Sequence, residues 1–266
     1  MELTLVLTGA VTGFVVGLTS TGGGALLTPA LVLLVNVPAR IAIGSDVLIA
    51  AAIKLVSGSF YAWRGDAHYP TVARLLAGSI PGALTGLALV SRLPAEGSET
   101  ILRGALGVVL VVAGAAIAFR LRYETPPQFD KPFPRTLQTS AIGFVIGVLV
   151  SVTSIGSGSL LLVALSLRYP LAPRTTVGTD LLHALVLSAV VSGGHWSAGR
   201  VDLELVGNVL VGAIPGALGG AMLATAVPQR ALRAALAAVL VAIGVQLTAS
   251  SLSLPAKAVA QEQVQR

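Results

Sequence analysis

Thr19-Ser20-Thr21-Gly22-Gly23-Gly24 lies in the middle of an apolar run, residues 3–35, that contains no charged residue. Consecutive glycines are unfavourable inside a helix, because each one costs about 1 kcal/mol relative to alanine. In lipid, irregular backbone is tolerated only where it is buried in protein or lines a cavity. The stretch therefore predicts a break in a membrane helix, and it is the first candidate for a binding site.

The chain contains a second break of the same kind. Thr153-Ser154-Ile155-Gly156-Ser157-Gly158 lies inside the uncharged run 137–167. As one straight helix, residues 3–35 would be about 50 Å long, well beyond a hydrocarbon core of about 30 Å. Divided at its break, each run leaves two arms that are too short to span comfortably. These lengths favour a re-entrant hairpin with its tip near mid-membrane, and a single tilted, broken helix is the alternative.

The composition is that of an integral membrane protein. Hydrophobic residues make up 55% of the chain and charged residues 11%, against about 25% charged residues in a soluble domain. The 266 residues suffice for about eight membrane segments of ~20 residues each. We therefore expect a multi-pass protein of the inner or plasma membrane, with the lipid bilayer as its surroundings.

Charge and cysteine content exclude several classes of partner and cofactor. The formal net charge is +6, but Lys and Arg lie at segment ends and in short loops, which is typical of membrane orientation and of contact with anionic headgroups. We therefore expect no nucleic-acid partner. The absence of cysteine excludes a disulfide, an iron–sulfur cluster and a thiolate zinc site, and we expect no metal and no cofactor.

The two halves of the chain match at a constant offset of 134 residues. Apolar composition alone would match only Leu, Ala and Val, whereas the matches here include Gly, Pro, Arg and Asp. Secondary transporters are frequently built from such repeats, with the site at the repeat interface and formed by discontinuous helices. The matching pairs include Thr19 with Thr153, Ser20 with Ser154, Gly22 with Gly156, Gly24 with Gly158, Arg40 with Arg174, Asp46 with Asp180, and Gly78-Ser79-Ile80-Pro81-Gly82 with Gly212-Ala213-Ile214-Pro215-Gly216.

These patterns predict an all-α, polytopic membrane protein with two homologous repeats. Each repeat is expected to be a broken, re-entrant helical hairpin followed by three transmembrane helices. An odd number of crossings requires the second repeat to be inverted, and eight full crossings with parallel halves are the alternative. We expect a first repeat over 1–120, a polar Pro-rich linker over 121–135, a second repeat over 136–252 and a frayed polar tail over 253–266. The six crossing helices are expected at 41–63, 71–90, 101–119, 176–196, 203–226 and 231–252.

The distribution of Lys and Arg indicates an orientation. In both arrangements, nine of these residues fall on the side of the linker and six on the other side, which favours a cytoplasmic linker and outer termini. The nine are Arg64, Arg120, Arg122, Lys131, Arg135, Arg168, Arg174, Arg230 and Arg233, and the six are Arg40, Arg92, Arg103, Arg200, Lys257 and Arg266.

The two breaks are candidates for binding a small anion. Without side chains, glycine N–H groups can approach a ligand closely, and the second arm of each hairpin begins there with the partial positive charge of a helix N-terminus. Hydroxyl groups add further donors. Close packing of helices through small residues is the alternative reading. The candidate residues are Thr19, Ser20, Thr21, Gly22, Gly23 and Gly24 in the first break, and Thr153, Ser154, Gly156, Ser157 and Gly158 in the second.

Four ionisable residues inside the apolar segments are further candidates. Asp46 and Asp180 each follow an Arg by six residues, so each is either a helix cap or salt-bridge partner of that Arg or a proton-coupling carboxylate. Lys54 lies on the same helix face as Asp46, and His183 shares a face with Asp180. A cation at mid-membrane is a functional candidate, so we assign Lys54 to the substrate site and keep its pairing with Asp46 as the alternative. His183 is either a proton-coupling group or a satisfied core residue.

With these residues in place, the chain resembles the TauE/SafE sulfite exporter family, also called the toluene sulfonate uptake permease family. The marks are Gly13-Phe14-Val15-Val16-Gly17 before Gly22-Gly23-Gly24, then Pro29, then Gly44-Ser45-Asp46, and similar features from Gly143 on. The second half departs from the pattern with Gly156-Ser157-Gly158 and with Val163 in place of Pro29. The resemblance covers the chain from Gly13 to about Leu247. It implies a secondary transporter of sulfite or of sulfur-containing organic anions in a bacterial or archaeal inner membrane.

We therefore expect a secondary transporter of sulfite, a sulfonate or a related small anion, bound between the two breaks and coupled to protons through Asp46 or Asp180. A passive anion channel on the same scaffold is the first alternative, and a membrane assembly factor is another. An intramembrane enzyme is not expected, because Ser45 and Thr179 precede the aspartates where an aspartyl protease needs Gly, and no His-Glu-x-x-His motif occurs. A homo-oligomer is left open.

Overall fold

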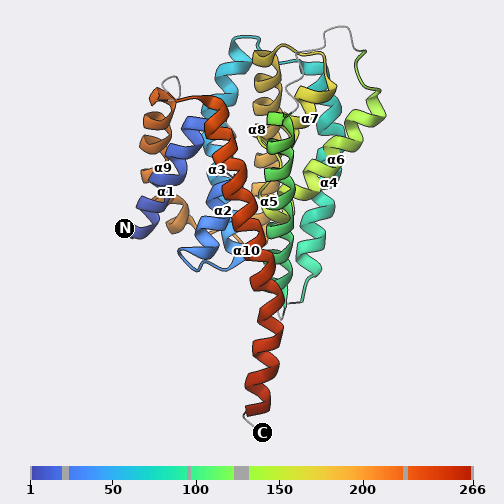
Figure 1. Cartoon of the computed structure of the whole chain (residues 1–266). Helices are drawn as coiled ribbons and strands as arrows, with labels where there is room; N and C mark the ends of the chain where they lie inside the picture. The colour runs from blue at the N-terminus through green and yellow to red at the C-terminus, as the bar shows by residue number, and fades with distance from the viewer. Residues whose placement is uncertain (1, 20–23, 95–96, 123–131, 224–226, 265–266) are drawn as a thin grey trace.

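The computed structural model describes residues 2–19, 24–94, 97–122, 132–223 and 227–264. Within these ranges all regular elements are helices, so the all-α expectation is confirmed (Figure 1). The first half contains α1 (Leu3–Thr19), α2 (Gly24–Leu33), α3 (Ala39–Trp63), α4 (Tyr69–Arg92) and α5 (Ser98–Arg122). The second half contains α6 (Thr136–Thr153), α7 (Leu160–Arg168), α8 (Pro173–Ser197), α9 (Leu203–Leu223) and α10 (Gln229–Val264).

Several of these helices match the thickness of a bilayer. Among the described residues, α4, α5, α6, α8, α9 and residues 230–252 of α10 are long and apolar enough to cross a membrane. Helix α3 has 25 residues, about 37 Å of helix. The chain is therefore a polytopic membrane protein, as the composition predicts.

The C-terminal helix differs from the expectation. We expected a frayed tail after residue 252, but α10 continues to Val264, and its last turns extend away from the other helices (Figure 1). The reason is local composition, because the run 256–263 consists of Ala, Lys, Gln and Glu apart from one Val, and these are strong helix formers.

Both apolar runs with a central break form two helices. Helices α2 and α7 have only 10 and 9 residues, about 15 Å each, and are too short to cross a hydrocarbon core. In Figure 1 the outer ends of α1 and α2 lie on the lower side of the molecule, and those of α6 and α7 lie on the upper side. Helix α6 ends because Ser154 adopts a left-handed conformation with φ of 62°, and Gly156 and Gly158 also have positive φ, which glycine adopts at little cost.

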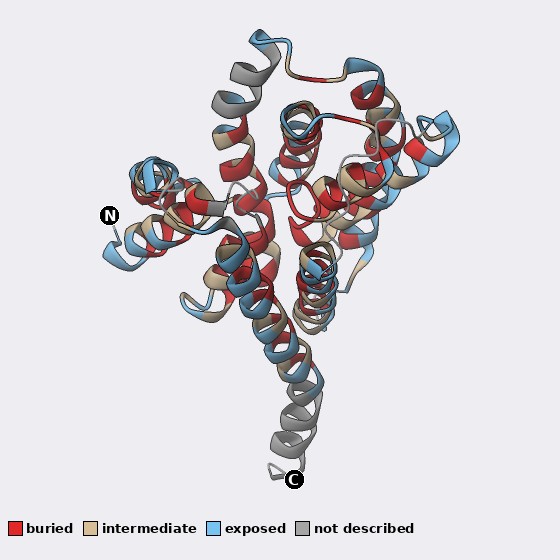
Figure 2. Ribbon diagram, turned by 45° about the horizontal axis from the view of Figure 1, so that its top comes forward, coloured by how far each residue is buried: buried red, intermediate tan, exposed pale blue. Residues whose placement is uncertain are grey.

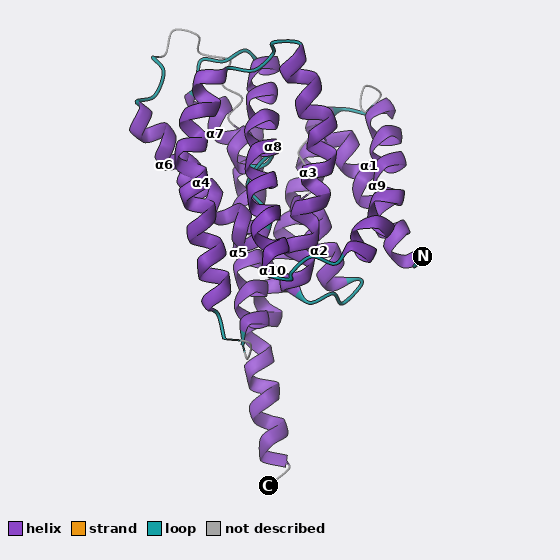
Figure 3. Ribbon diagram, turned by 180° about the vertical axis from the view of Figure 1, so that it is seen from behind, coloured by secondary structure: helices purple, strands orange, loops and turns teal. Residues whose placement is uncertain are grey.

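The helices pair mainly between the two halves. Helix α1 packs on α9, α4 on α6, α5 on α10 and α3 on α8 (Figure 3). Glycines make the first two pairs close: a Cβ on Gly13 would collide with the backbone of Ala213, and one on Gly147 would collide with the backbone of Ser79. These two contacts are related by the 134-residue offset. Small residues of this kind let helix backbones approach closely in membranes.

The buried residues gather along the middle of the bundle, and apolar side chains also cover its outside (Figure 2). Leu31, Leu106 and Leu240 are fully buried in one cluster, and Leu75 and Leu187 in another. Outward-facing positions carry exposed apolar side chains such as those of Val11, Val211 and Leu218, as a lipid-facing surface requires. The polar residues inside this shell therefore need a specific explanation.

Candidate functional site

The α3–α8 pair carries the buried charged groups of the bundle interior. Asp46 is 0% exposed and Lys54 6% exposed on α3, and Asp180 is 3% exposed and His183 0% exposed on α8. Their helices belong to opposite halves and pack against each other. Ionisable groups buried at membrane depth are costly and mark functional sites by default.

Lys54 connects the centre of α3 to the break between α6 and α7. Its Nζ donates to Ser157 Oγ at 2.8 Å and to Ser188 Oγ of α8 at 3.4 Å. Asp180 and Asp46 are both close enough to interact electrostatically with Lys54. Lys54 is therefore not simply paired with Asp46. Lys54 and Ser188 are 134 positions apart, so residues at matching positions of the two halves meet here.

The break between α6 and α7 also meets Asp180. The Gly158 N–H donates to Asp180 Oδ1 at 3.2 Å, so a carboxylate already occupies one backbone donor of the predicted anion site. Thr153 and Ser154 are engaged within the break: the Thr153 hydroxyl donates to Leu149 O at 2.7 Å, and the Ser154 N–H donates to Val150 O at 2.8 Å. Of the second set of candidates, Ser157 and Gly158 thus reach the buried charges directly.

Asp46 lies inside α3 and faces α2. Its Oδ2 accepts a hydrogen bond from the Thr28 hydroxyl, and its buried Oδ1 has no partner among the described residues. The Ser154 hydroxyl, also buried and without a partner among those residues, lies nearby. A cavity of about 20 Å³ between α1, α2, α3 and α9 reaches Asp46 and Gly13, and this volume has room for about one water molecule.

The reading of the aspartates as caps or as salt-bridge partners of the preceding Arg is wrong. Arg40 donates to Leu93 O at 2.8 Å, and Arg174 pairs with Asp66 at 3.0 Å. Each Asp is the sixth residue after its Arg along the helix, so the guanidinium lies at a segment end while the carboxylate lies about 9 Å deeper.

His183 belongs to the same interior but contacts a different helix. One ring nitrogen, Nε2, is 2.9 Å from Ser79 Oγ of α4. Its Nδ1 is buried without a partner among the described residues. The structure thus connects α8 to α4 through a polar contact, and the choice between a proton-coupling and a core role stays a prediction.

The first break is only partly described. Helix α1 ends at Thr19 and α2 begins at Gly24, while Ser20, Thr21, Gly22 and Gly23 lie outside the described residues. The expectation that the two breaks face each other across one site therefore stays a prediction.

The structure adds four polar residues that sequence reasoning did not place in the site. Ser188 carried a usable signal, because it matches Lys54 at the repeat offset. Thr28 precedes Pro29 inside an apolar arm, and Ser79 lies in the duplicated Gly-Pro motif of α4, but neither position indicates its partner. Ser159 is the N-cap residue before α7, and its buried hydroxyl has no partner among the described residues.

This arrangement suits reversible binding of a small charged solute. One ammonium and two carboxylates share a buried interior with serine hydroxyls and a backbone donor, and their helices come from both halves of the chain. Binding or release of a proton or of an anion would change the net charge of this interior. A site at the meeting point of discontinuous helices is the arrangement found in secondary transporters.

Comparison with known proteins agrees with this reading. Residues 5–247 match the family model for the sulfite exporter TauE/SafE. The chain is 34% identical over 258 residues to the probable membrane transporter protein YjnA of Bacillus subtilis, covering 93% of this chain and 100% of YjnA. It is 27% identical to the probable membrane transporter protein YdhB of the same organism, covering 84% of this chain and 91% of YdhB. No solved structure matches the chain significantly.

These relatives and the apolar helices identify a multi-pass transporter of the plasma membrane and not an enzyme. The family match extends from α1 into α10 and includes both breaks and all the buried charged groups described above. The chain therefore belongs to the sulfite exporter TauE/SafE family.

Proposed function

We propose that this protein is a proton-coupled carrier of a small sulfur-containing anion, such as sulfite, a sulfonate or a related organosulfur compound. The observation that carries the proposal is the contact of Lys54 with Ser157 at 2.8 Å, beside the Gly158 N–H. An ammonium, a hydroxyl and a backbone N–H converge there at the end of a helix break. Charge-assisted hydrogen bonds of this kind are the strong contacts to oxyanions.

Because of the charges in the site, binding of an anion would depend on protonation. With Asp46, Asp180 and Lys54 all ionised, the interior carries one net negative charge, which repels an anion. Protonation of Asp180 removes that excess and frees the Gly158 N–H and Lys54 for the substrate. The carboxylate of Asp180 thus competes with the substrate for the same donors, and anion binding is favoured when a proton is bound.

The same proposal includes two inverted repeats, 1–120 and 136–252, joined by the linker 121–135 and followed by the tail 253–266. Close contacts between the halves are related by one offset, such as Gly13 with Ala213 and Gly147 with Ser79. The hairpins also have their outer ends on opposite sides (Figure 1). Rocking of hairpins against the α3–α8 pair would expose the site alternately to each side.

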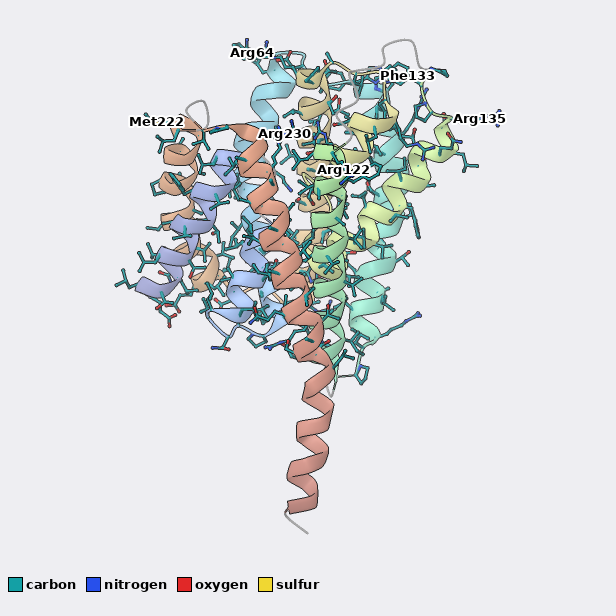
Figure 4. All side chains as sticks on the ribbon, in the orientation of Figure 1. Arg64, Arg122, Phe133, Arg135, Met222 and Arg230 are labelled. Atoms are coloured by element: carbon teal, nitrogen blue, oxygen red, sulfur yellow. The ribbon has the colours of Figure 1, made fainter. Side chains whose placement is uncertain are left out.

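We also propose that the linker side is cytoplasmic. Arg64, Arg122, Arg135 and Arg230 all lie on the upper side of the molecule in Figure 4. An excess of Lys and Arg in short loops marks the cytoplasmic side of a membrane protein. Both chain ends would then lie outside the cytoplasm.

Uptake into proteoliposomes tests the carrier. Sulfite and methanesulfonate are offered with and without an imposed proton gradient, and we expect accumulation of at least one of them only with the gradient. Lys54→Met should reduce uptake to the level of protein-free liposomes, and Ser157→Ala should reduce it severalfold. Arg92→Met and Ser166→Ala are matched controls, because Arg92 is exposed at a helix end and the Ser166 hydroxyl donates only to its own helix.

Each alternative has its own result in this assay. Flux down a gradient without accumulation under a proton gradient identifies a passive channel. Wild-type accumulation by Lys54→Met would remove Lys54 from the substrate site.

A further inference from the structure

The two ends of the α3–α8 pair are held by the same kind of hydrogen bond. On the linker side, the His68 N–H donates to Thr179 Oγ1 at 2.9 Å. On the opposite side, the Asp202 N–H donates to Ser45 Oγ at 3.0 Å. The donors are 134 positions apart and so are the acceptors. The loops 64–68 and 198–202 therefore dock on the pair in matching ways, and residues at matching positions can be compared directly.

On the linker side, the docked loop 64–68 forms an ion pair with the start of α8. Arg174 Nε lies 3.0 Å from Asp66 Oδ2, and Arg64 Nε lies 3.7 Å from the same oxygen. The guanidinium at the start of α8 is thus neutralised by a carboxylate of the docked loop.

On the opposite side the matching pair has two cations. Arg40 matches Arg174, but Arg200 stands at the position that matches Asp66. Arg200 is 8% exposed, and its Nη1 is buried without a partner among the described residues. The unpartnered buried atom of Arg40 is Nε, which is the atom that faces the carboxylate in Arg174. Each of the two side chains therefore has a buried N–H donor without a partner among the described residues.

Neighbouring groups hold the two arginines in place without neutralising them. Arg40 Nη2 donates to Leu93 O, and Arg200 Nη2 donates to Ser91 Oγ, both at 2.8 Å. The nearby Glu99 accepts from the Ala39 N–H at 2.9 Å and pairs with Arg103 at 2.6 Å. Burial and repulsion from Arg40 lower the pKa of Arg200, in agreement with two close cations. Among the described residues, neither Arg40 nor Arg200 forms an ion pair.

We propose that Arg40 and Arg200 form a second anion-binding site at the end of the transporter opposite the linker. Its ligand is an oxyanion of the sulfate, sulfonate or phosphate type, because paired guanidinium groups with free N–H donors match the geometry of such oxygens. Arg40 and Lys54 are 14 positions apart on α3, about 21 Å of helix, so the site is separate from Lys54. The oxyanion comes either from a solute or from the phosphate of a lipid headgroup.

Thermal unfolding of the purified full chain in detergent tests the site. Sodium sulfate is the probe and replaces chloride at constant ionic strength. For the wild type we expect a saturable rise in the unfolding temperature. Arg200→Asp gives this end the same charges as the linker-side pair, so the variant should fold at least as stably as the wild type. The sulfate concentration that gives a half-maximal rise in its unfolding temperature should be at least tenfold higher. Arg200→Gln should also lose the response, and it replaces Arg200→Asp if that variant does not fold.

The matched control is Arg92→Asp, which changes the net charge equally at the same end but on an exposed side chain. The unfolding temperature of this variant should rise with sulfate concentration as that of the wild type does. Native mass spectrometry separates the two sources of the oxyanion: a phospholipid kept by the wild type and by Arg92→Asp but lost by Arg200→Asp assigns the lipid phosphate. Loss of the sulfate response in Arg200→Asp with no such lipid assigns the solute.

If Arg200→Asp and Arg200→Gln respond to sulfate as the wild type does, and no lipid depends on Arg200, the proposal is wrong. Because the central site is itself proposed to bind sulfur oxyanions, the Lys54→Met variant separates the two sites. Lys54→Met should keep the sulfate response of the wild type even though it loses uptake.

Discussion

At the scale of single residues, Asp180 is the group that we propose to link proton binding to substrate binding. Its carboxylate accepts from the Gly158 N–H at 3.2 Å and lies close enough to Lys54 to attract its ammonium group electrostatically. An internal carboxylate thereby occupies the donors that we assign to the substrate anion. Neutralising the Asp180 carboxylate should favour binding of the substrate anion without any change in the helix positions.

Asp180→Asn tests this competition. The amide is neutral at every pH, so substrate binding should no longer require a proton at this position. Exchange of methanesulfonate, which stays anionic throughout, should fall from mildly acidic to mildly alkaline pH in the wild type and be nearly flat in the variant. Proton-driven accumulation should fall in parallel. Asp66→Asn, at the linker end, should keep the slope of the wild type, and an unchanged slope in Asp180→Asn would contradict the assignment.

The residues of the site could be predicted from sequence only in part. Lys54 and the aspartates stood out because charges are rare within apolar segments, and Ser157 because it interrupts a helix. The contact between Lys54 and Ser157 joins positions 103 apart, so it depends on how α3 packs beside the break. Nothing local in the sequence indicates Thr28 as the partner of Asp46.

At the scale of elements, glycines set the distance between paired helices. A Cβ on Gly82 of α4 would run into the carbonyl oxygen of Phe144 on α6, whereas one on Gly207 of α9 would meet no atom within 4 Å. Glycine is therefore required for close helix packing at position 82 of α4, whereas position 207 of the matching helix α9 has room for a side chain.

This difference predicts opposite effects of one substitution. Gly82→Ala should lower the free energy of unfolding by about 1–3 kcal/mol, because the backbones must separate or shift. Gly207→Ala should raise it by about 0.5–1 kcal/mol, because alanine is the better helix former and nothing is displaced. Thermal or denaturant unfolding of the purified variants measures both, and equal effects at the two positions would count against close packing of α4 on α6.

The breaks in the helices were predictable, whereas the cross-pairing of the halves was not. Glycine and serine runs inside long apolar segments indicate where helices end, and α6 ends one residue before the left-handed Ser154. The same sequence pattern fits helices packed within each half equally well. The choice of α9 as the partner of α1 depends on contacts between residues about 200 positions apart.

At the scale of the whole molecule, orientation has a direct test. The chain has no cysteine, so an introduced cysteine is the only thiol in this protein that a membrane-impermeant maleimide can label. We expect Arg92→Cys to react in intact cells and Arg135→Cys to react only after lysis, because these exposed residues lie at opposite ends. The reverse pattern would place the linker outside and would move the Arg40–Arg200 end to the cytoplasm.

The pairing of α1 with α9 and of α4 with α6 has a consequence for biogenesis. When α1 enters the membrane, its partner has not been synthesised, and roughly 200 further residues take about 10–40 s at ordinary rates of translation. During that interval the glycine-lined face of α1 can meet only lipid or the insertion machinery. Deletions in the second half should therefore leave the first half exposed to membrane proteases, and its survival should depend on how quickly α9 arrives.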